Sequence, residues 1–396
     1  MANVSSSNGL EKRPKLRFPG FDEPYKQCRI GDIYAERSQR GASDMELLSV
    51  TMNDGVKPRS EIEGKDNSSE DKSNYKIVRK GDMVYNSMRM WQGANGISPC
   101  DGIVSPAYTV LMPKQEINNG YFTALFKSAN LINEFRKNSQ GMTSDTWNLK
   151  YPQIETIKVQ IPSVSEQDKV SEMFSVLDER IAAQSRLVES LKKYKRGLLS
   201  QLIAQKKAFD TSGEWKTVKL GHIFKERTER AKGNETLLAV TISNGVQRRD
   251  EIDLKDNSSD DKSNYKCVYI GDIAYNTMRM WQGASGVSPY NGIVSPAYTI
   301  VTPIRPDLHN MTFWAYYFKY SPLVQTFQKY SQGLTSDTWN LKFPRFSEIA
   351  VTMPPISEQD KIAECLSVFD EHCKCEDEKL QALLQVRTSL LQQLFI

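Results

Sequence analysis

Residues 86–93, Asn-Ser-Met-Arg-Met-Trp-Gln-Gly, hold side chains suited to reading the edges of DNA bases. The guanidinium of Arg89 could hydrogen-bond a guanine in the major groove, and the carboxamide of Gln92 an adenine. Gly93 and Gly96 have no side chain, so the backbone there can approach a partner closely. The pattern predicts a base-reading segment. The alternative is that its Met and Trp side chains belong to the core and that Arg89 is a solvated or paired charge.

This segment returns later in the chain, and two further polar segments accompany it. The loop at 139–148 carries hydroxyls and amides that suit phosphate or base contacts. It could also be an ordinary loop in which Trp147 is a packing plug. The run Lys-Asp-Asn-Ser-Ser at 65–69 is a third candidate, with a solvated turn as the alternative. The predicted DNA-contacting residues are Asn86, Arg89, Trp91, Gln92, Ser144, Thr146, Asn148, Lys65 and Asn67 in the first copy, and Asn276, Arg279, Trp281, Gln282, Ser336, Thr338, Asn340, Lys255 and Asn257 in the second.

The motifs that could suggest catalysis are incomplete. Val-Ser-Pro-Ala-Tyr, at 104–108 and 294–298, is similar to the Asn/Asp-Pro-Pro-Tyr catalytic motif of amino-methyltransferases. Its first catalytic position is Ser, its second Pro is Ala, and no Gly-rich cofactor loop precedes it, so we interpret it as the start of a strand. There is no Walker lysine loop, and the three histidines do not occupy matching positions in the two copies. We expect no catalytic residue in this chain.

The six cysteines show no zinc-type spacing, and none recurs at a matching place in the two copies. Cys373 and Cys375, beside His372, could form one corner of a metal site, but the sequence offers no second half. We therefore interpret the cysteines as reduced, incidental thiols and predict no metal site.

One long internal repeat organises the sequence. Residues 65–110 match residues 255–300 at a constant offset of 190, with 34 of 46 positions identical. After a two-residue insertion, Thr-Ser-Asp-Thr-Trp-Asn-Leu-Lys at 143–150 returns at 335–342. The repeat is too long for a solenoid, so we interpret it as a duplicated module of a globular domain followed by a helix.

Each globular domain is expected to mix helices and strands. In the first copy, residues 75–86 and 103–113 have the β-branched and aromatic content of strands. Residues 121–137 have apolar side chains at helical spacing. Residues 154–161 alternate as a last strand that stops at Pro162. The second copy repeats this order.

A long helix is expected to follow each domain. Ser165 and Ser357 each precede an Asp by three residues, a capping-box variant that predicts a helix start. Beyond them, spacings of four and three alternate, which indicates a coiled-coil seam. At 1.5 Å per residue each helix would be roughly 60 Å long. The predicted seam positions are Val170, Phe174, Leu177, Ile181, Gln184, Val188, Leu191, Lys195, Leu198 and Leu202, and then Ile362, Leu366, Phe369, Cys373, Glu376, Leu380, Leu383, Arg387, Leu390 and Leu394.

Charge predicts how these helices pair. Residues 165–185 hold five acids and two bases, and residues 186–207 hold one acid and seven bases. Residues 357–378 hold eight acids and two bases, and residues 379–396 hold two bases and no acid. Antiparallel pairing places basic segments against acidic ones. Exposed ion pairs contribute only about 0.2–1 kcal/mol each, but several that point the same way should set the orientation.

The order domain, helix, domain, helix resembles the DNA specificity subunit of Type I restriction-modification systems. Each helix opens with Pro-Ser-Val-Ser-Glu-Gln-Asp-Lys at 162–169 or Pro-Pro-Ile-Ser-Glu-Gln-Asp-Lys at 354–361. A Pro…Ser-Glu-Gln run between a recognition domain and a spacer helix is a strong marker of that family. The resemblance covers nearly the whole chain.

The resemblance implies that each domain is a target recognition domain for one half of a split DNA site. The spacer helices would set the distance between half-sites and dock two methyltransferase (modification) subunits, which restriction subunits with translocase activity can join. S-adenosylmethionine, ATP and Mg are expected on those partner subunits, and no cofactor is expected on this chain. Nearly duplicate domains depart from many family members.

We predict from the repeat that both domains read the same short half-site. Opposed helices would give the pair a pseudo-two-fold axis, and the target would be an interrupted, near-palindromic sequence. Differences such as Asn95/Ser285 and Cys100/Tyr290 could alter one base between the halves. Two alternatives remain: the DNA-binding part of a self-contained methyltransferase or nuclease, and an assembly scaffold that binds DNA without sequence preference.

The expected fold class is α+β, with two mixed globular domains separated by two long helices that form an antiparallel coiled coil. We expect recognition domains at 1–163 and 208–355 and spacer helices at 164–207 and 356–396. The net charge of +4 permits a nucleic-acid partner without demanding one. There is no membrane-length apolar stretch, and no secretory signal in the first twenty residues, so we expect a cytoplasmic protein.

Overall fold

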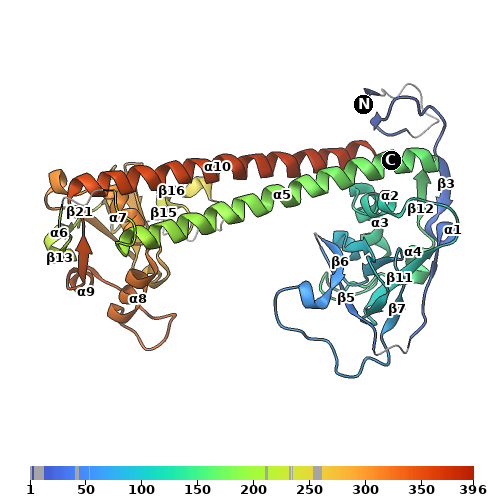
Figure 1. Ribbon diagram of the computed structural model, residues 1–396, viewed down its shortest axis with the longest axis horizontal. Coiled ribbons are helices and arrows are strands. Elements are labelled where there is room, and N and C mark those ends of the chain that lie inside the picture. The colour runs from blue at the N-terminus through green and yellow to red at the C-terminus, as the bar shows by residue number, and fades with distance from the viewer. Residues whose placement is uncertain are drawn as a thin grey trace. The chain divides into compact units, whose positions relative to one another are not determined.

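The computed structural model of the protein describes residues 2–3, 13–40, 44–52, 54–209, 213–231, 233, 235–252 and 261–396. The chain divides into two compact units, which Figure 1 shows as ribbons. Unit 1 is Met1–Ser185 together with Glu378–Ile396, and unit 2 is Arg186–Asp377. Each unit contains one copy of the repeat, and each of the two long helices contributes to both units.

Unit 1 is built from short strands and helices. Its strands are β1 (Ala2–Asn3), β2 (Leu16–Arg17), β3 (Lys26–Arg29), β4 (Tyr34–Glu36), β5 (Leu47–Thr51), β6 (Gly55–Pro58), β7 (Lys76–Val78), β8 (Met83–Asn86), β9 (Asn95–Ile97), β10 (Gly102–Val104), β11 (Tyr108–Pro113) and β12 (Lys158–Ile161). Its short helices are α1 (Ile30–Ile33), η1 (Arg59–Glu61), η2 (Met90–Gln92), α2 (Asn119–Leu125), α3 (Ala129–Asn138) and α4 (Tyr151–Ile154).

Two four-stranded sheets form the middle of unit 1. Their strand orders are β6-β5-β10-β7 and β4-β11-β8-β9. All neighbours are antiparallel except β10 and β5, which are parallel. Valines and a leucine from both sheets form one small core cluster, so the two sheets pack face to face. The pairs β1-β2 and β12-β3 are separate.

Unit 2 repeats the order of these elements, but one of its sheets is divided into two pairs of strands. Its strands are β13 (Lys216–Lys219), β14 (Phe224–Glu226), β15 (Leu238–Thr241), β16 (Gly245–Arg248), β17 (Lys266–Val268), β18 (Ile273–Asn276), β19 (Ser285–Val287), β20 (Gly292–Val294), β21 (Tyr298–Pro303) and β22 (Ala350–Met353). Its short helices are α6 (Leu220–Ile223), η3 (Arg249–Glu251), η4 (Met280–Gln282), η5 (Pro306–Leu308), α7 (Met311–Tyr317), α8 (Ser321–Tyr330) and α9 (Phe343–Ser347). The sheet β14-β21-β18-β19 matches β4-β11-β8-β9 of unit 1 strand for strand, but the counterpart of the sheet β6-β5-β10-β7 is divided into the pairs β15-β16 and β17-β20.

The structure corrects the predicted element bounds in four places. The predicted strand 75–86 is two strands, β7 and β8, because a turn at Gly81 (φ +90°) separates them. The predicted strand 103–113 is two strands, β10 and β11, which lie in different sheets because a turn at 105–107 separates them. The predicted helix 121–137 is two helices, because the Ser128 hydroxyl accepts from Leu131 N and begins α3 anew. The predicted last strand begins only at Lys158, because a turn of helix, α4, precedes it.

The long helices are α5 (Val164–Ile203) and α10 (Ile356–Gln393). Every predicted seam position is buried or half-buried, including the polar Gln184 and Glu376. The seam prediction is therefore confirmed. Among the described residues, no helix is both long enough and apolar enough to cross a membrane.

Within unit 1, the end of α10 lies antiparallel to the start of α5. The guanidinium of Arg387 pairs with the carboxylate of Asp178 at 2.5 Å, and the ring of Phe395 stacks on that of Phe174 with centroids 6.0 Å apart. Residue numbers rise from Phe174 to Asp178 along α5, while those of their partners fall from Phe395 to Arg387, so the two chain segments run in opposite directions.

Unit 2 shows the same direction of pairing. Lys192 Nζ lies 3.1 Å from Asp377 Oδ1, and Lys195 pairs with Asp370. Basic residues of α5 thus meet acidic residues of α10, as the charge pattern predicts. The antiparallel pairing is confirmed within each unit.

The Ser-Glu-Gln-Asp motif in unit 1 ties the start of α5 to the domain. Glu166 is buried and accepts two hydrogen bonds from the guanidinium of Arg17, at 2.8 and 2.9 Å. Gln167 accepts from the backbone of Asn118, and Asp168 accepts from its side chain. Figure 1 shows α2, which Asn118 caps, beside the start of α5.

The predicted capping box at Ser165 and Ser357 is wrong. Both serines lie inside their helices, which begin at Val164 and Ile356. The carboxylates of Asp168 and Asp360 bond Asn side chains of the domain rather than the helix start. The two Asp carboxylates that the capping pattern assigned to the helix start therefore bond to residues of the globular domain instead.

Candidate nucleic-acid interface

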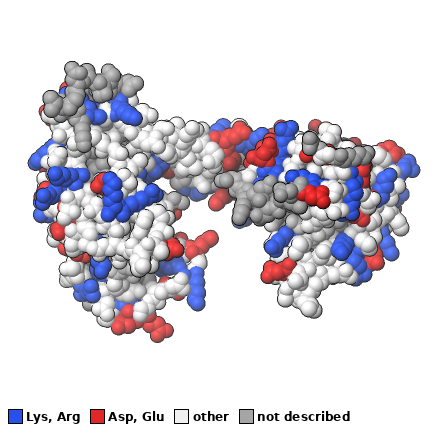
Figure 2. Space-filling model, turned by 180° about the vertical axis from the view of Figure 1, so that it is seen from behind, with Lys and Arg blue, Asp and Glu red and all other residues white. Residues whose placement is uncertain are grey.

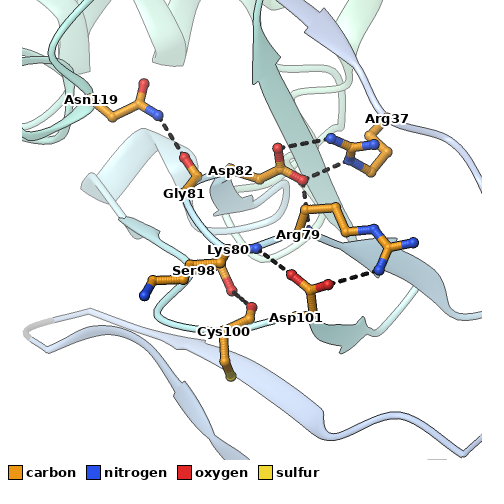
Figure 3. A network of polar contacts seen from close by, with 9 residues as sticks. All are labelled: Arg37, Arg79, Lys80, Gly81, Asp82, Ser98, Cys100, Asp101 and Asn119. Atoms are coloured by element: carbon orange, nitrogen blue, oxygen red, sulfur yellow. Dashed lines mark hydrogen bonds and ion pairs between the residues drawn. The ribbon is translucent and has the colours of Figure 1, made fainter.

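A charged network holds the turn that leads into the candidate segment of unit 1 (Figure 3). The buried carboxylate of Asp82 accepts from Arg37 Nε at 2.6 Å and from the backbone N of Arg79 at 2.9 Å. This carboxylate raises the pKa of the Arg37 guanidinium, chiefly through the hydrogen bond. Asp101 accepts from the side chain of Arg79 and the backbone of Lys80. Strand β8 therefore starts from a fixed turn.

The candidate segment forms a tight connection between β8 and β9. Asn86 Oδ1 accepts from Met88 N at 3.0 Å, and Asn86 N donates to Ala94 O at 3.0 Å. The side chain of Met90 is fully buried and anchors the short helix η2. Gly93 ends that helix at φ +85°, a conformation that favours glycine. Hydrogen bonds and the buried Met90 side chain thus hold this segment, which we call the projection of unit 1, in one conformation.

The polar side chains of this projection face solvent. Arg89 and Gln92 are exposed, and Met88 is 41% exposed. Within the described part of the chain, no hydrogen bond or ion pair is found for the side chains of Arg89 and Gln92. The alternative in which Arg89 is an internally paired charge finds no support in this geometry. Met90 does belong to the core, as that alternative expected.

The loop at 139–148 is tied down at several points. Gln140 and Asn148 exchange backbone hydrogen bonds at 3.0 and 2.8 Å. The Thr146 hydroxyl bonds within the loop to both the N and the O of Thr143. Gly141 has φ +142°, and a Cβ there would lie 2.5 Å from Thr146 O. The hydroxyl of Thr146, a predicted DNA contact, is therefore engaged in holding the loop.

The structure brings these two segments together. The rings of Trp91 and Trp147 meet edge to face with centroids 5.2 Å apart. The guanidinium of Arg136 lies over the Trp91 ring at 5.4 Å. We call the contact between Trp91 and Trp147, with the two segments that it joins, the junction. Leu149 N donates to Ser87 O at 2.9 Å and so also links these segments. Trp147 is a packing plug, as one interpretation expected, and its packing joins the two candidate segments into one surface.

Unit 2 builds the same contact between two Trp rings, although Gln328 stands at the position of Arg136. The rings of Trp281 and Trp339 have centroids 5.2 Å apart, and Leu341 N donates to Thr277 O at 2.9 Å. Of the predicted residues of unit 2, those that are exposed are Arg279, Gln282, Ser336 and Thr338, and those that are half-buried are Asn276, Trp281 and Asn340. Their unit 1 counterparts have the same burial, with Ser144 exposed and Asn148 half-buried.

A cavity of about 340 Å³ adjoins the junction in unit 2. Its lining includes Met278, Asn340 and Lys342. The side-chain oxygen of Asn340 is buried and has no hydrogen-bond partner among the described residues, and the same holds for Asn148 in unit 1. An incoming hydrogen-bond donor would satisfy a group that the folded chain leaves unsatisfied.

The third predicted segment is not part of this junction. Lys65 and Asn67 are exposed, and Asp66 between them lies 3.6 Å from Arg59. In the part of the chain that the structure describes, no hydrogen bond, ion pair or ring contact joins 65–69 to the other two segments. Lys255 and Asn257 lie outside the described residues.

Three features of the junction were missed by the sequence analysis. Arg136 covers Trp91, although nothing in the sequence links a residue of that helix to the candidate segment. A lysine in each unit, Lys127 and Lys319, is half-buried beside the glycine that ends the short helix, Gly93 or Gly283. The apolar Met142 and Leu334 stand fully exposed in the loops. The sequence did offer a signal for Met142 and Leu334. Each is an apolar residue in an otherwise polar loop, at the same position in both copies.

Lys319 bonds to the backbone of the matching projection of unit 2, residues 276–283, and should make the stability of unit 2 depend on pH. Its ammonium group donates to Ile242 O at 3.0 Å and also to Gly283 O. Burial, with a smaller effect from Lys195, lowers its pKa from 10.5 to about 8. Between these values the unfolded chain binds more protons than the folded chain at this group, so stability should rise with pH.

We expect the free energy of unfolding to rise by about 1 kcal/mol per pH unit from pH 8 to pH 10 because of this group. Urea unfolding of wild type and of Lys319→Met at each pH isolates the effect, since the variant should lack that part of the rise. Lys329→Met, at an exposed position of α8, is the matched control. An identical pH slope in wild type and Lys319→Met would contradict the prediction.

On the face drawn in Figure 2, Lys and Arg are interspersed with Asp and Glu in both units. Among the described residues, no group of three or more His, Cys, Asp and Glu side chains is arranged to hold a metal ion. DNA contacts at these junctions would therefore rest on the individual side chains placed there.

Comparison with known proteins identifies the family. Residues 23–193 and 212–385 match the family described as Type I restriction modification DNA specificity domain. The chain is similar to the S subunit of a Type I restriction-modification system from M. genitalium, with 15% identity and a TM-score of 0.59 over 97% of this chain and 99% of that chain.

Two further solved structures are similar. One is described as showing complex assembly and conformational transition of the type I R-M system, with 14% identity and a TM-score of 0.57 over 95% of this chain and 98% of that chain. The other is the HsdS subunit from Thermoanaerobacter tengcongensis, with 15% identity and a TM-score of 0.46 over 98% of each chain. The structures with the higher scores show a shared fold, and the family match extends over most of both halves. The chain therefore belongs to the Type I restriction-modification DNA specificity family.

Proposed function

We propose that this chain is the non-catalytic specificity subunit of a Type I restriction-modification complex and that its two units read the same short DNA half-site. One observation carries the second part of the proposal. Each unit presents the same free arginine and glutamine on the same Trp–Trp junction. Identical donors and acceptors in the same local geometry should select the same bases.

In this proposal residues 1–163 and 208–355 are the recognition domains. The helices at 164–207 and 356–396 space them and dock two methyltransferase subunits, which restriction subunits with translocase activity can join. S-adenosylmethionine, ATP and Mg would belong to those partners. The proposed DNA-contacting residues are those at each junction, with 65–69 and its counterpart as a separate, weaker contact.

The target should be an interrupted, near-palindromic sequence. The support comes from the antiparallel course of α5 and α10 within each unit, since equivalent domains that each lead into one of two opposed helices would meet a duplex in opposite strand sense. The copies differ at Asn95/Ser285, which are fully buried, and at Cys100/Tyr290, which pack partly buried against the small core cluster of each unit. A single base difference between the half-sites is compatible with these changes.

Mapping methylated adenines in a host that expresses the chain with its methyltransferase subunits tests the proposal. We expect methylation at two copies of one half-site, in opposite orientation and separated by a fixed spacer. Two unrelated half-sites would defeat the symmetry but leave the specificity role intact. Methylation without sequence preference would defeat the specificity role, and S-adenosylmethionine binding to the isolated chain would favour a self-contained methyltransferase instead.

A further inference from the structure

Each junction carries one apolar side chain that the fold leaves entirely in solvent. Met142 in unit 1 and Leu334 in unit 2 are both 100% exposed. Exposed apolar residues are common on protein surfaces, but these two stand on loops fixed by the backbone and hydroxyl bonds described above. The fold therefore presents an apolar group at a defined position without using it for its own stability.

Comparison of the two copies shows that apolar character is retained there. Residues 139–150 and 331–342 are identical except at this position, which is Met in one copy and Leu in the other. Both side chains are unbranched at Cβ and of similar volume. An apolar surface of this size, at the same place on two otherwise polar loops, fits an apolar partner group.

A carboxylate close to each exposed apolar side chain indicates which part of DNA this loop tip, Met142 or Leu334, approaches. Asp145 and Asp337 are exposed on the same loops, three residues after the apolar side chain. A carboxylate is repelled by phosphates and by the minor groove, whose A·T edges offer only acceptors. The major groove offers donors at adenine N6 and cytosine N4, and its apolar feature is the C5 methyl group of thymine.

We infer that Met142 and Leu334 each contact the C5 methyl group of a thymine in the major groove, one in each half-site. This inference rests on the proposed function, because it requires the junctions to face specific DNA. It adds a chemical statement about one base of the target: the half-site contains a thymine whose methyl group is covered by a loop tip of this chain.

The test uses the intact complex with its methyltransferase subunits and a duplex carrying the target found by methylation mapping. Each thymine of the target is replaced in turn by deoxyuridine, which removes only the methyl group. Burying one methyl group contributes about 0.8 kcal/mol, so we expect one replacement per half-site to weaken wild-type binding about fourfold.

Protein variants identify which side chain covers each methyl group. Met142→Ser should abolish the sensitivity to deoxyuridine in one half-site, and Leu334→Ser should abolish it in the other. Leu308→Ser, at a 44% exposed position in η5 of unit 2, is the matched control and should retain the wild-type pattern.

The outcomes separate this inference from the proposed function. Sequence-specific methylation with no thymine in the half-sites, or with no deoxyuridine effect at any position, would overturn the inference while the specificity role stands. So would loop-tip variants that keep the wild-type sensitivity. The absence of any specific target would instead overturn the proposed function at the mapping stage.

Discussion

Replacing Phe395 with alanine should lower the free energy of unfolding of unit 1 by about 3–5 kcal/mol. Phe395 is 5% exposed, although it is the penultimate residue of the sequence. Its ring stacks on Phe174 and meets the edge of Tyr121 with centroids 5.4 Å apart. Alanine would leave a cavity in a core that includes α1, α2 and α3, and the surrounding side chains can close it only partly.

Hydrogen exchange measured by mass spectrometry can resolve the effect unit by unit. We expect the slowest amides of β8 and α3 in unit 1 to exchange about 100-fold to 4000-fold faster in the variant, because each 1.4 kcal/mol is a factor of ten. Amides of unit 2 should change little. Phe209→Ala, at a 44% exposed position, is the control. Unchanged protection in unit 1 would show that the end of α10 does not stabilise its core.

Arg279→Ala should weaken specific DNA binding of the intact complex about 10-fold to 100-fold. A bidentate arginine–guanine contact is worth about 1–3 kcal/mol of discrimination. Arg279 is exposed beside the Trp281–Trp339 junction, and no protein partner is found for it among the described residues. Because Arg89 is unchanged in the other unit, methylation mapping should show relaxed specificity at one base of one half-site only.

Two comparison variants define the role of this arginine. Arg279→Lys retains the charge but loses the paired donors, so it should recover non-specific affinity without recovering base discrimination. Arg305→Ala removes an exposed arginine that pairs with Asp307 elsewhere in unit 2, and it should leave specificity unchanged. A loss of affinity that is equal for all DNA sequences would place Arg279 on a phosphate rather than on a base.

The sequence by itself determined the features that depend on local pattern. The repeat predicted two equivalent units, because nearly identical sequences fold alike. The alternation of spacings along α5 and α10 predicted a buried seam, and opposed charge along the same helices predicted antiparallel pairing. Both properties follow from residues close together in the chain. The segment at 86–93 could also be proposed as a base-reading segment, because its polar side chains and glycines are contiguous.

The tertiary structure alone decided which distant residues meet. Trp91 and Trp147 are far apart in the sequence, and each could equally have packed into its own element. The carboxylate of Asp168, which the sequence pattern assigned to a local cap, instead accepts from the side chain of Asn118. The buried carboxylate of Glu166 pairs with Arg17, because a buried charge must be paired. Strands of three or four residues have little stability of their own. The hydrogen bonds to neighbouring strands, rather than the β-propensity of the residues, therefore set where each strand begins and ends. The surface proposed to read DNA is therefore a product of the fold, although its polar side chains are visible in the sequence.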